Sequence, residues 1–254
     1  MRIYLLLLRA ELRNLYFSPA TYIAAFLFVL LMGLLFQYSV NNFIQSTQEI
    51  PPWVLFFQET FWVPVCFMVP LLTMRSFAEE KKMGTLEAIL STPVQPASLV
   101  LAKFSAAYLF YLLLWGFTLG FNALLYQLAP SPNLWEFGPI AGGILFTLFS
   151  GLLFVAVGIF TSALTKSQLV AGIFSFTALF LLIFGTWFMT RMPMTEITLP
   201  AELIPTLQLV DIFQHAEDFG QGVIDSRPMV LYFSAAVCLL FSSILIVESK
   251  LWRS

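Results

Sequence analysis

The chain has 254 residues, of which 59% are apolar and 10% are charged, and its net charge is −2. Soluble domains are about 45–50% apolar and about 25% charged, and they avoid large apolar surface patches. The composition therefore excludes a soluble domain and indicates an all-α, polytopic membrane protein. Because the sequence has no basic tail and no Lys/Arg run, nucleic-acid binding is not expected.

Residues 1–18 are predicted to form an amphipathic helix that lies in the membrane interface as an elbow before the first span. The apolar run 3–8 is too short for a signal peptide, and charged residues follow it at once. A frayed leader with no role is the other interpretation. On a helical repeat, six positions form one apolar stripe: Tyr4, Leu5, Leu8, Leu12, Leu15 and Tyr16.

Six later stretches are apolar enough to be membrane spans, which need about 20 residues each. The second stretch is the weakest, because Pro64 and Pro70 interrupt it. We treat residues 1–254 as one transmembrane domain, with five spans within 20–189, an extracytoplasmic segment at 190–228 and a sixth span. The expected spans are residues 20–38, 54–72, 104–128, 139–164, 169–189 and 229–247.

The distribution of Lys and Arg predicts the orientation, since cytoplasmic loops are enriched in both. With six spans, one side of the membrane holds ten of these residues and the other holds two, Arg191 and Arg227. Both termini are therefore expected in the cytoplasm. The ten are Arg2, Arg9, Arg13, Arg75, Lys81, Lys82, Lys103, Lys166, Lys250 and Arg253.

Groups able to do chemistry are scarce. Cys66 and Cys238 both lie in apolar runs and are expected to be free thiols, and no metal-ligand spacing can be built from them. No catalytic Ser/His/Asp set and no GxxxxGK[ST] nucleotide-binding loop can be assembled. The chain is therefore not expected to be an enzyme or to hold a cofactor. If it drives uphill transport, another subunit must supply the energy.

The most polar stretch joins the second and third spans, at residues 74–93. Residues 79–82, with the sequence Glu-Glu-Lys-Lys, are expected to form a solvated helix that Gly84 ends. Thr85 is predicted to cap a second short helix, with Glu87 favourable in its first turn.

Three apolar residues of this second helix fall on one face, and they are expected to be exposed outside the bilayer. An exposed apolar helix face usually has a partner, although it could instead fold back onto the membrane surface. These residues are Leu86, Ile89 and Leu90.

The run RSFAEEKKMGTLEAILSTPV, followed by Leu101-Ala102-Lys103-Phe104, resembles the signature loop of type-2 ABC exporter permeases. The resemblance implies that helix 85–91 is a coupling helix seated in a cleft of an ABC ATP-binding subunit. The implied contact residues are Gly84, Thr85, Leu86, Glu87, Ile89 and Leu90, and the implied loop signature is Arg75, Glu79 and Glu80.

The stretches 162–165 and 222–227, together with His215, look closest to the gliding-motility-type branch of that family. In the family, the segment before the last span often forms two short helices that dip into the outer leaflet. Here such re-entrant helices and a folded extracytoplasmic cap both stay open, as does a partner on that side.

The resemblance implies a permease subunit of an ATP-driven exporter in the inner membrane of a bacterium. A second permease, identical or different, would complete the transporter, and ATPase closure would drive alternating access. Two alternatives stay open. One is a non-transporting membrane anchor that recruits a cytoplasmic partner, and the other is an autonomous channel or carrier. The substrate does not follow from the sequence.

Overall fold

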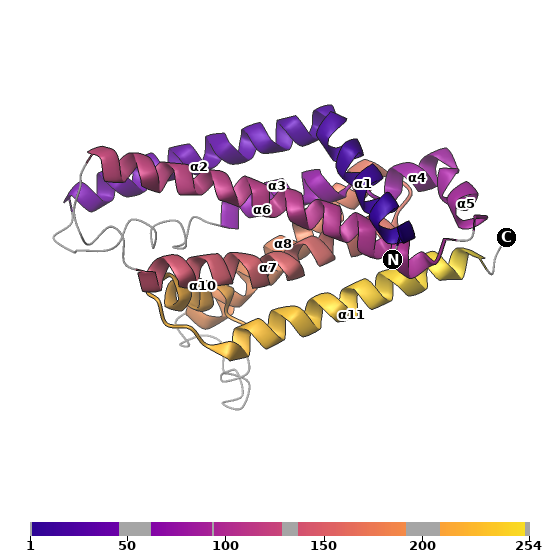
Figure 1. The fold of residues 1–254 in the computed structure, drawn as a ribbon. Helices are drawn as coiled ribbons and strands as arrows, with labels where there is room; N and C mark the ends of the chain where they lie inside the picture. The colour runs from indigo at the N-terminus through magenta and orange to yellow at the C-terminus, as the bar shows by residue number, and fades with distance from the viewer. Residues whose placement is uncertain (1, 46–61, 93, 129–136, 192–208, 252–254) are drawn as a thin grey trace.

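The structure, a computed structural model, describes residues 2–45, 62–92, 94–128, 137–191 and 209–251. Every regular element within these ranges is an α-helix, which confirms the predicted all-α membrane fold. Figure 1 shows the long helices running side by side as a bundle. The helices are α1 Arg2–Phe17, α2 Pro19–Gln45, α3 Trp62–Thr73, α4 Ala78–Met83, α5 Thr85–Leu90, α6 Pro96–Leu128, α7 Phe137–Leu164, α8 Gln168–Arg191, α10 Ile212–Gly220 and α11 Ser226–Leu251.

Five of the described helices are long and apolar enough to cross a membrane: α2, α6, α7, α8 and α11. They coincide with five of the six predicted spans. The remaining prediction, 54–72, overlaps α3, which has 12 residues. At 1.5 Å per residue α3 rises about 18 Å, short of a hydrocarbon core of about 30 Å. Residues 54–61 lie outside the described part, so the count of six is not confirmed.

Helix α7 lies at the centre of the bundle and contacts α3, α6, α8, α10 and α11. Small residues on α7 allow these close approaches. A Cβ on Gly142 would overlap the carbonyl oxygen of Phe219, and one on Gly158 would overlap the hydroxyl of Thr73. Close packing of membrane helices at small residues agrees with the general rule for such interfaces.

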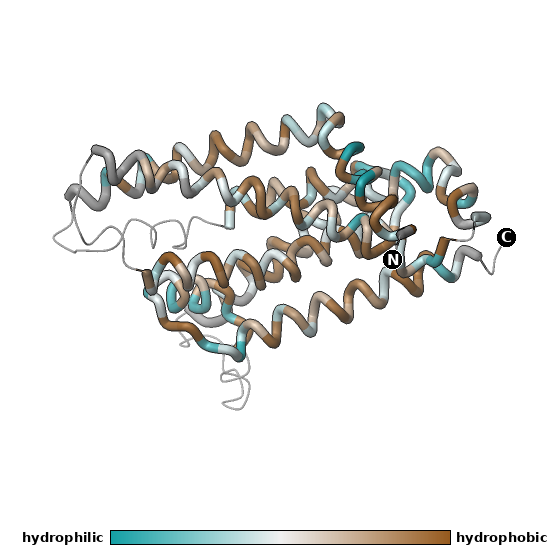
Figure 2. Tube along the Cα trace, viewed as in Figure 1, coloured by the Kyte–Doolittle hydropathy of each residue, from teal (hydrophilic) through white to brown (hydrophobic). Residues whose placement is uncertain are grey.

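The polar elements gather at the two ends of the bundle. Helices α1, α4 and α5 and the C-terminal end of α11 lie at one end, and α10 lies at the other (Figure 1). Figure 2 shows that α4 and part of α1 are hydrophilic, whereas the long helices are mainly hydrophobic between the ends. The start of α1 and the end of α11 thus lie at the same end of the bundle as the α4–α5 loop.

The predicted helix at the start of the chain is α1, and its inward face overlaps the predicted stripe only in part. It packs on α6, and the hydroxyl of Tyr4 donates to Oγ of Ser105 at 2.8 Å. Leu7 and Leu15 pack against the core, whereas Leu5 is 56% exposed. Tyr4 and Leu15 belong to the predicted stripe and face inward, whereas Leu5 and Tyr16 of that stripe are exposed.

Helix α10 lies within the predicted extracytoplasmic segment and packs on α7 and α8. Asp211 caps it, because its side chain accepts from the backbone N–H groups of Phe213 and Gln214. His215 is buried and its Nδ1 lies 2.9 Å from the hydroxyl of Tyr232 in α11. Burial lowers the pKa of His215, so the neutral ring is favoured at this contact. Residues 192–208 lie outside the described part.

Candidate functional site

The loop between α3 and α6 folds into two six-residue helices, α4 and α5, joined at Gly84. Gly84 has φ of 72°, the left-handed conformation that glycine adopts without steric cost. The predicted break at Gly84 is therefore confirmed. A side chain at this position would strain the turn even though no atom lies within 4 Å of an added Cβ.

The predicted cap at Thr85 is wrong. Gly84 occupies the cap position of α5, which makes no side-chain cap hydrogen bond. The hydroxyl of Thr85 instead lies 3.4 Å from the carbonyl oxygen of Glu80 in α4. The left-handed turn at Gly84 makes Thr85 the first helical residue, so its hydroxyl faces the preceding helix. Glu87 lies in the first turn of α5, as predicted, and is exposed.

The predicted exposure of Leu86 is also wrong, because only 3% of this residue is exposed. Leu86 belongs to the buried core, Ile89 packs partly against it, and α5 contacts α11. Leu86 and Ile89 therefore find their partners within the chain. The outward positions are Thr85, Glu87 and Ala88, and Met83 before the turn is 62% exposed. The side chain of Leu90 lies outside the described part.

The loop-signature residues Arg75 and Glu79 form a two-point ion pair. The Arg75 guanidinium donates from Nε and Nη2 to the two carboxylate oxygens of Glu79, at 2.8 and 3.1 Å. Its Nη1 donates to Oγ of Ser18 at 3.0 Å. Because Ser18 lies between α1 and α2, this pair links the turn after α3 to the elbow before the first span.

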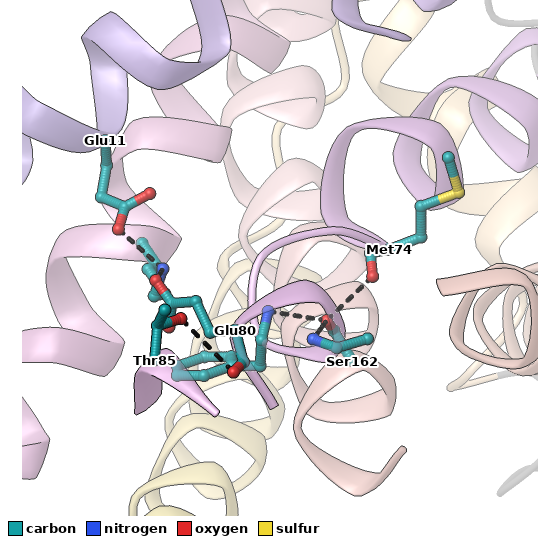
Figure 3. Close-up of polar contacts among 8 residues, drawn as sticks. Glu11, Met74, Glu80, Thr85 and Ser162 are labelled. Carbon is teal, nitrogen blue, oxygen red and sulfur yellow. Dashed lines mark hydrogen bonds and ion pairs between the residues drawn. The ribbon is translucent and has the colours of Figure 1, made fainter. Parts of the chain in front are cut away.

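The third signature residue, Glu80, belongs to a triad of charges from three helices (Figure 3). The Lys103 ammonium in α6 donates to Oε1 of Glu11 in α1 and to Oε1 of Glu80 in α4, both at 2.6 Å. Only 2% of the Lys103 side chain is exposed. A cation this deeply buried is stable only when it is paired, and here two carboxylates pair it.

The surroundings of the triad are partly apolar. The Lys103 ammonium lies 5.3 Å from the centre of the Phe77 ring, a cation–π contact. Burial raises the pKa of Glu80, and the nearby Lys103 opposes that effect. Oε2 of Glu80 is buried without a hydrogen-bond partner among the described residues.

The C-terminal end of α7 holds the other side of α4. Oγ of Ser162 accepts from the backbone N–H groups of Phe77 and Ala78, at 3.0 and 3.3 Å, and donates to the carbonyl oxygen of Met74 (Figure 3). The Lys81 ammonium donates to the carbonyl oxygen of Ala163. Helix α4 is thus attached to α1, α6 and α7 by polar contacts.

Arg75, Glu79 and Glu80 were recognisable from the sequence, whereas the ion pairs of Lys103 with Glu80 and Glu11 were missed, and so was the contact of Ser162 with the start of α4. The sequence does mark Lys103 and Glu11 as isolated charges. Lys103 is the only charged residue of the 33-residue α6, and Glu11 is the only acidic residue of α1. Isolated charges in apolar helices usually pair with one another. Nothing in the sequence specified which ones meet.

Residues 55–247 match the family model described as ABC-2 family transporter protein. The match covers most of the chain and includes α3 through α8, α10 and most of α11. The chain belongs to the ABC-2 transporter family. It is therefore a permease component of an ABC transporter, which works in a membrane with an ABC ATP-binding subunit and is not itself catalytic. The match does not extend to the gliding-motility branch, and no curated protein matches this ABC-2 permease in a direct sequence comparison.

Proposed function

We propose that this ABC-2 permease is the membrane-spanning subunit of an ATP-driven exporter in a bacterial inner membrane, and that helices α4 and α5 couple it to the ATPase. The observation that carries the proposal is the attachment of α4 to α1, α6 and α7 through Lys103 and Ser162. A movement of the ATPase against α4 and α5 would be transmitted to the membrane spans through these contacts, as rigid-body switching requires.

The outward face of α4 and α5 supports the same assignment. Met83 and Ala88 are exposed apolar side chains, and Glu87 is an exposed carboxylate beside them. An apolar patch with a charged edge fits a cleft in a partner protein. In this proposal Leu86 and Ile89 anchor α5 from inside, whereas Met83, Thr85, Glu87 and Ala88 meet the ATPase.

The charges at this end support a cytoplasmic orientation. Arg75, Lys81, Lys82 and Lys103 all lie in or beside α4, and Lys166 follows α7 at the same end. Excess Lys and Arg is the usual mark of the cytoplasmic side. Helix α1 and the end of α11 lie beside them, so both termini are proposed to be cytoplasmic.

The test is co-purification of the tagged permease with its ATPase in mild detergent, followed by substrate-dependent ATP turnover in vesicles. We expect Met83→Asp to remove the ATPase, because it places a charge in the apolar contact. Val223→Asp is the matched control, since Val223 is similarly exposed and lies between α10 and α11 at the opposite end.

Leu86→Ala distinguishes a contact residue from an anchor. It should lower the thermal stability of the permease, because it leaves a cavity in a packed core that costs about 2–5 kcal/mol. Met83→Asp should leave stability unchanged. Retention of the ATPase and of turnover in Met83→Asp would contradict the coupling proposal. If the unmodified permease binds the ATPase but shows no substrate-dependent ATP turnover, a non-transporting anchor is favoured.

A further inference from the structure

A partly open cavity of about 540 Å³ lies between the elbow and the α4–α5 loop. Its wall comes from the C-terminal half of α1, the start of α2, the end of α3, helix α4 and α6. The family assignment does not explain this space, since a coupling helix requires no cavity behind it.

The cavity lies where the elbow turns into the first membrane span. Phe17 forms part of the wall and is 77% exposed, and the span begins two residues later at Pro19. Tyr16 and Tyr22 are exposed close by. Exposed aromatic residues beside the end of a span mark the level of the lipid headgroups. The mouth of the cavity is thus at the depth of a headgroup.

The polar part of the wall carries an excess negative charge. Three carboxylates and two cations line it, which leaves one negative charge uncompensated. Oε2 of Glu80 has no hydrogen-bond partner but is itself buried, so the Glu80 side chain must turn toward the cavity to receive a donor there. A primary ammonium suits this position, because it brings one positive charge and three N–H donors. The five groups are Glu11, Glu79, Glu80, Arg75 and Lys103.

The same cavity also suits a phosphate and an acyl glycerol. Arg75 uses three of its five N–H donors on Glu79 and Ser18, so two are left for an anionic oxygen. The apolar remainder of the wall would receive the glycerol and the start of the chains. These apolar lining residues include Leu15, Phe17, Leu71, Leu72 and Ala106.

We propose that this cavity binds the headgroup of a phosphatidylethanolamine-type lipid, with the ammonium on Glu80 and the phosphate near Arg75. A phosphatidylcholine headgroup has no N–H to donate, and phosphatidylglycerol has no cation. A bound lipid would bridge the elbow and α4, so it would stabilise the position of the coupling loop. The binding itself requires no ATPase and does not depend on the proposed export function.

The test uses the full permease, delipidated in detergent, and short-chain phosphatidylethanolamine with its mono-, di- and trimethylated forms. Lipid retention is read by native mass spectrometry and by the rise in unfolding temperature. We expect retention to fall with each methyl group and by about tenfold or more for the trimethyl form, because the charge-assisted hydrogen bonds are lost. Phosphatidylglycerol and free phosphoethanolamine should bind more weakly than phosphatidylethanolamine.

Glu80→Gln should reduce phosphatidylethanolamine retention by about tenfold or more, since it removes the charge that receives the ammonium. Glu248→Gln, an exposed carboxylate of α11 away from the cavity, is the matched control. The methylation series on the unmodified protein keeps the test valid even if Glu80→Gln folds poorly. Equal retention of all methylated forms, or preferential retention of phosphatidylglycerol or of free phosphoethanolamine, would overturn the proposal.

Discussion

At the residue scale, the Lys103 ammonium is the point where three separate segments of the chain meet. It lies inside the protein with carboxylates of α1 and α4 on either side. A buried charge pair adds little net stability relative to apolar side chains, but removal of one partner leaves the others uncompensated. The cost of disturbing this triad therefore depends on which member is changed and on whether its partners are changed with it.

Lys103→Met should lower the free energy of unfolding by about 3 kcal/mol, because it leaves the partly buried carboxylates of Glu11 and Glu80 without their cation. Thermal unfolding in detergent measures the effect. Lys82→Met is the control, since Lys82 is exposed on α4 and its loss should change stability by about 0.5 kcal/mol or less. Adding Glu11→Gln and Glu80→Gln to Lys103→Met should recover part of the loss. Equal stability of the two single variants would contradict the role of the triad.

The stability of the folded protein should change with pH because Glu80 has a shifted pKa in the folded state. Burial raises its pKa above the ordinary value of 4.5, so the folded protein holds this proton more tightly than the unfolded chain does. The contribution of Glu80 to stability is thus fully present below about pH 4.5 and is lost as the pH rises through the raised pKa.

The unfolding temperature of the unmodified protein, relative to that of Glu80→Gln, should accordingly rise as the pH falls through the raised pKa of Glu80 toward 4.5. The two proteins are compared at one ionic strength, so that screening is the same for both. A difference that does not change with pH would mean that Glu80 is not buried as described.

At the element scale, helix α7 organises the bundle because its small residues let its neighbours approach. Gly142 faces the backbone of α10 and Gly158 faces α3. Small residues permit close packing of membrane helices, but they do not indicate which helix is the partner. For α5, the sequence identified Leu86 as part of an apolar face, but this residue is buried in the core and not exposed as predicted.

Gly142→Ala should be destabilising by about 1–3 kcal/mol, because the added Cβ overlaps a backbone carbonyl of α10 that cannot move independently. Thermal unfolding and proteolysis near α10 measure the effect. Gly120→Ala in α6 is the control. No atom lies within 4 Å of a Cβ at that site, and alanine is the better helix former. Loss of stability in Gly120→Ala but not in Gly142→Ala would contradict the described packing.

At the scale of the whole molecule, the two ends of the bundle differ in charge and in the elements they carry. The α4–α5 loop, the elbow and the end of α11 lie at one end, and α10 lies at the other (Figures 1 and 2). The proposed orientation, with the α4–α5 end in the cytoplasm, follows from the charges.

Cysteine labelling tests this orientation in a variant that lacks Cys66 and Cys238. Val223→Cys should react with a membrane-impermeant maleimide in spheroplasts, which expose the outer face of the inner membrane, because it is exposed beyond α10. Lys82→Cys, exposed on α4, should react only after the membrane is permeabilised. The opposite pattern would reverse the proposed orientation.

The sequence by itself determined the features that depend on composition and on local rules. Apolar length predicted five of the long helices, because a bilayer demands about 20 apolar residues wherever a helix crosses. The break at Gly84 followed from the conformational freedom of glycine, and the loop motif indicated the family. None of these inferences required knowledge of which helices are neighbours.

Tertiary structure alone decided the direction in which side chains point and which charges meet. Leu86 is buried because α5 packs against the rest of the bundle, and Lys103 pairs with Glu80 and Glu11 because α1, α4 and α6 converge at one end. Both results depend on contacts between residues far apart in the sequence. Helical periodicity defines the faces of each helix, but only packing selects which face is buried.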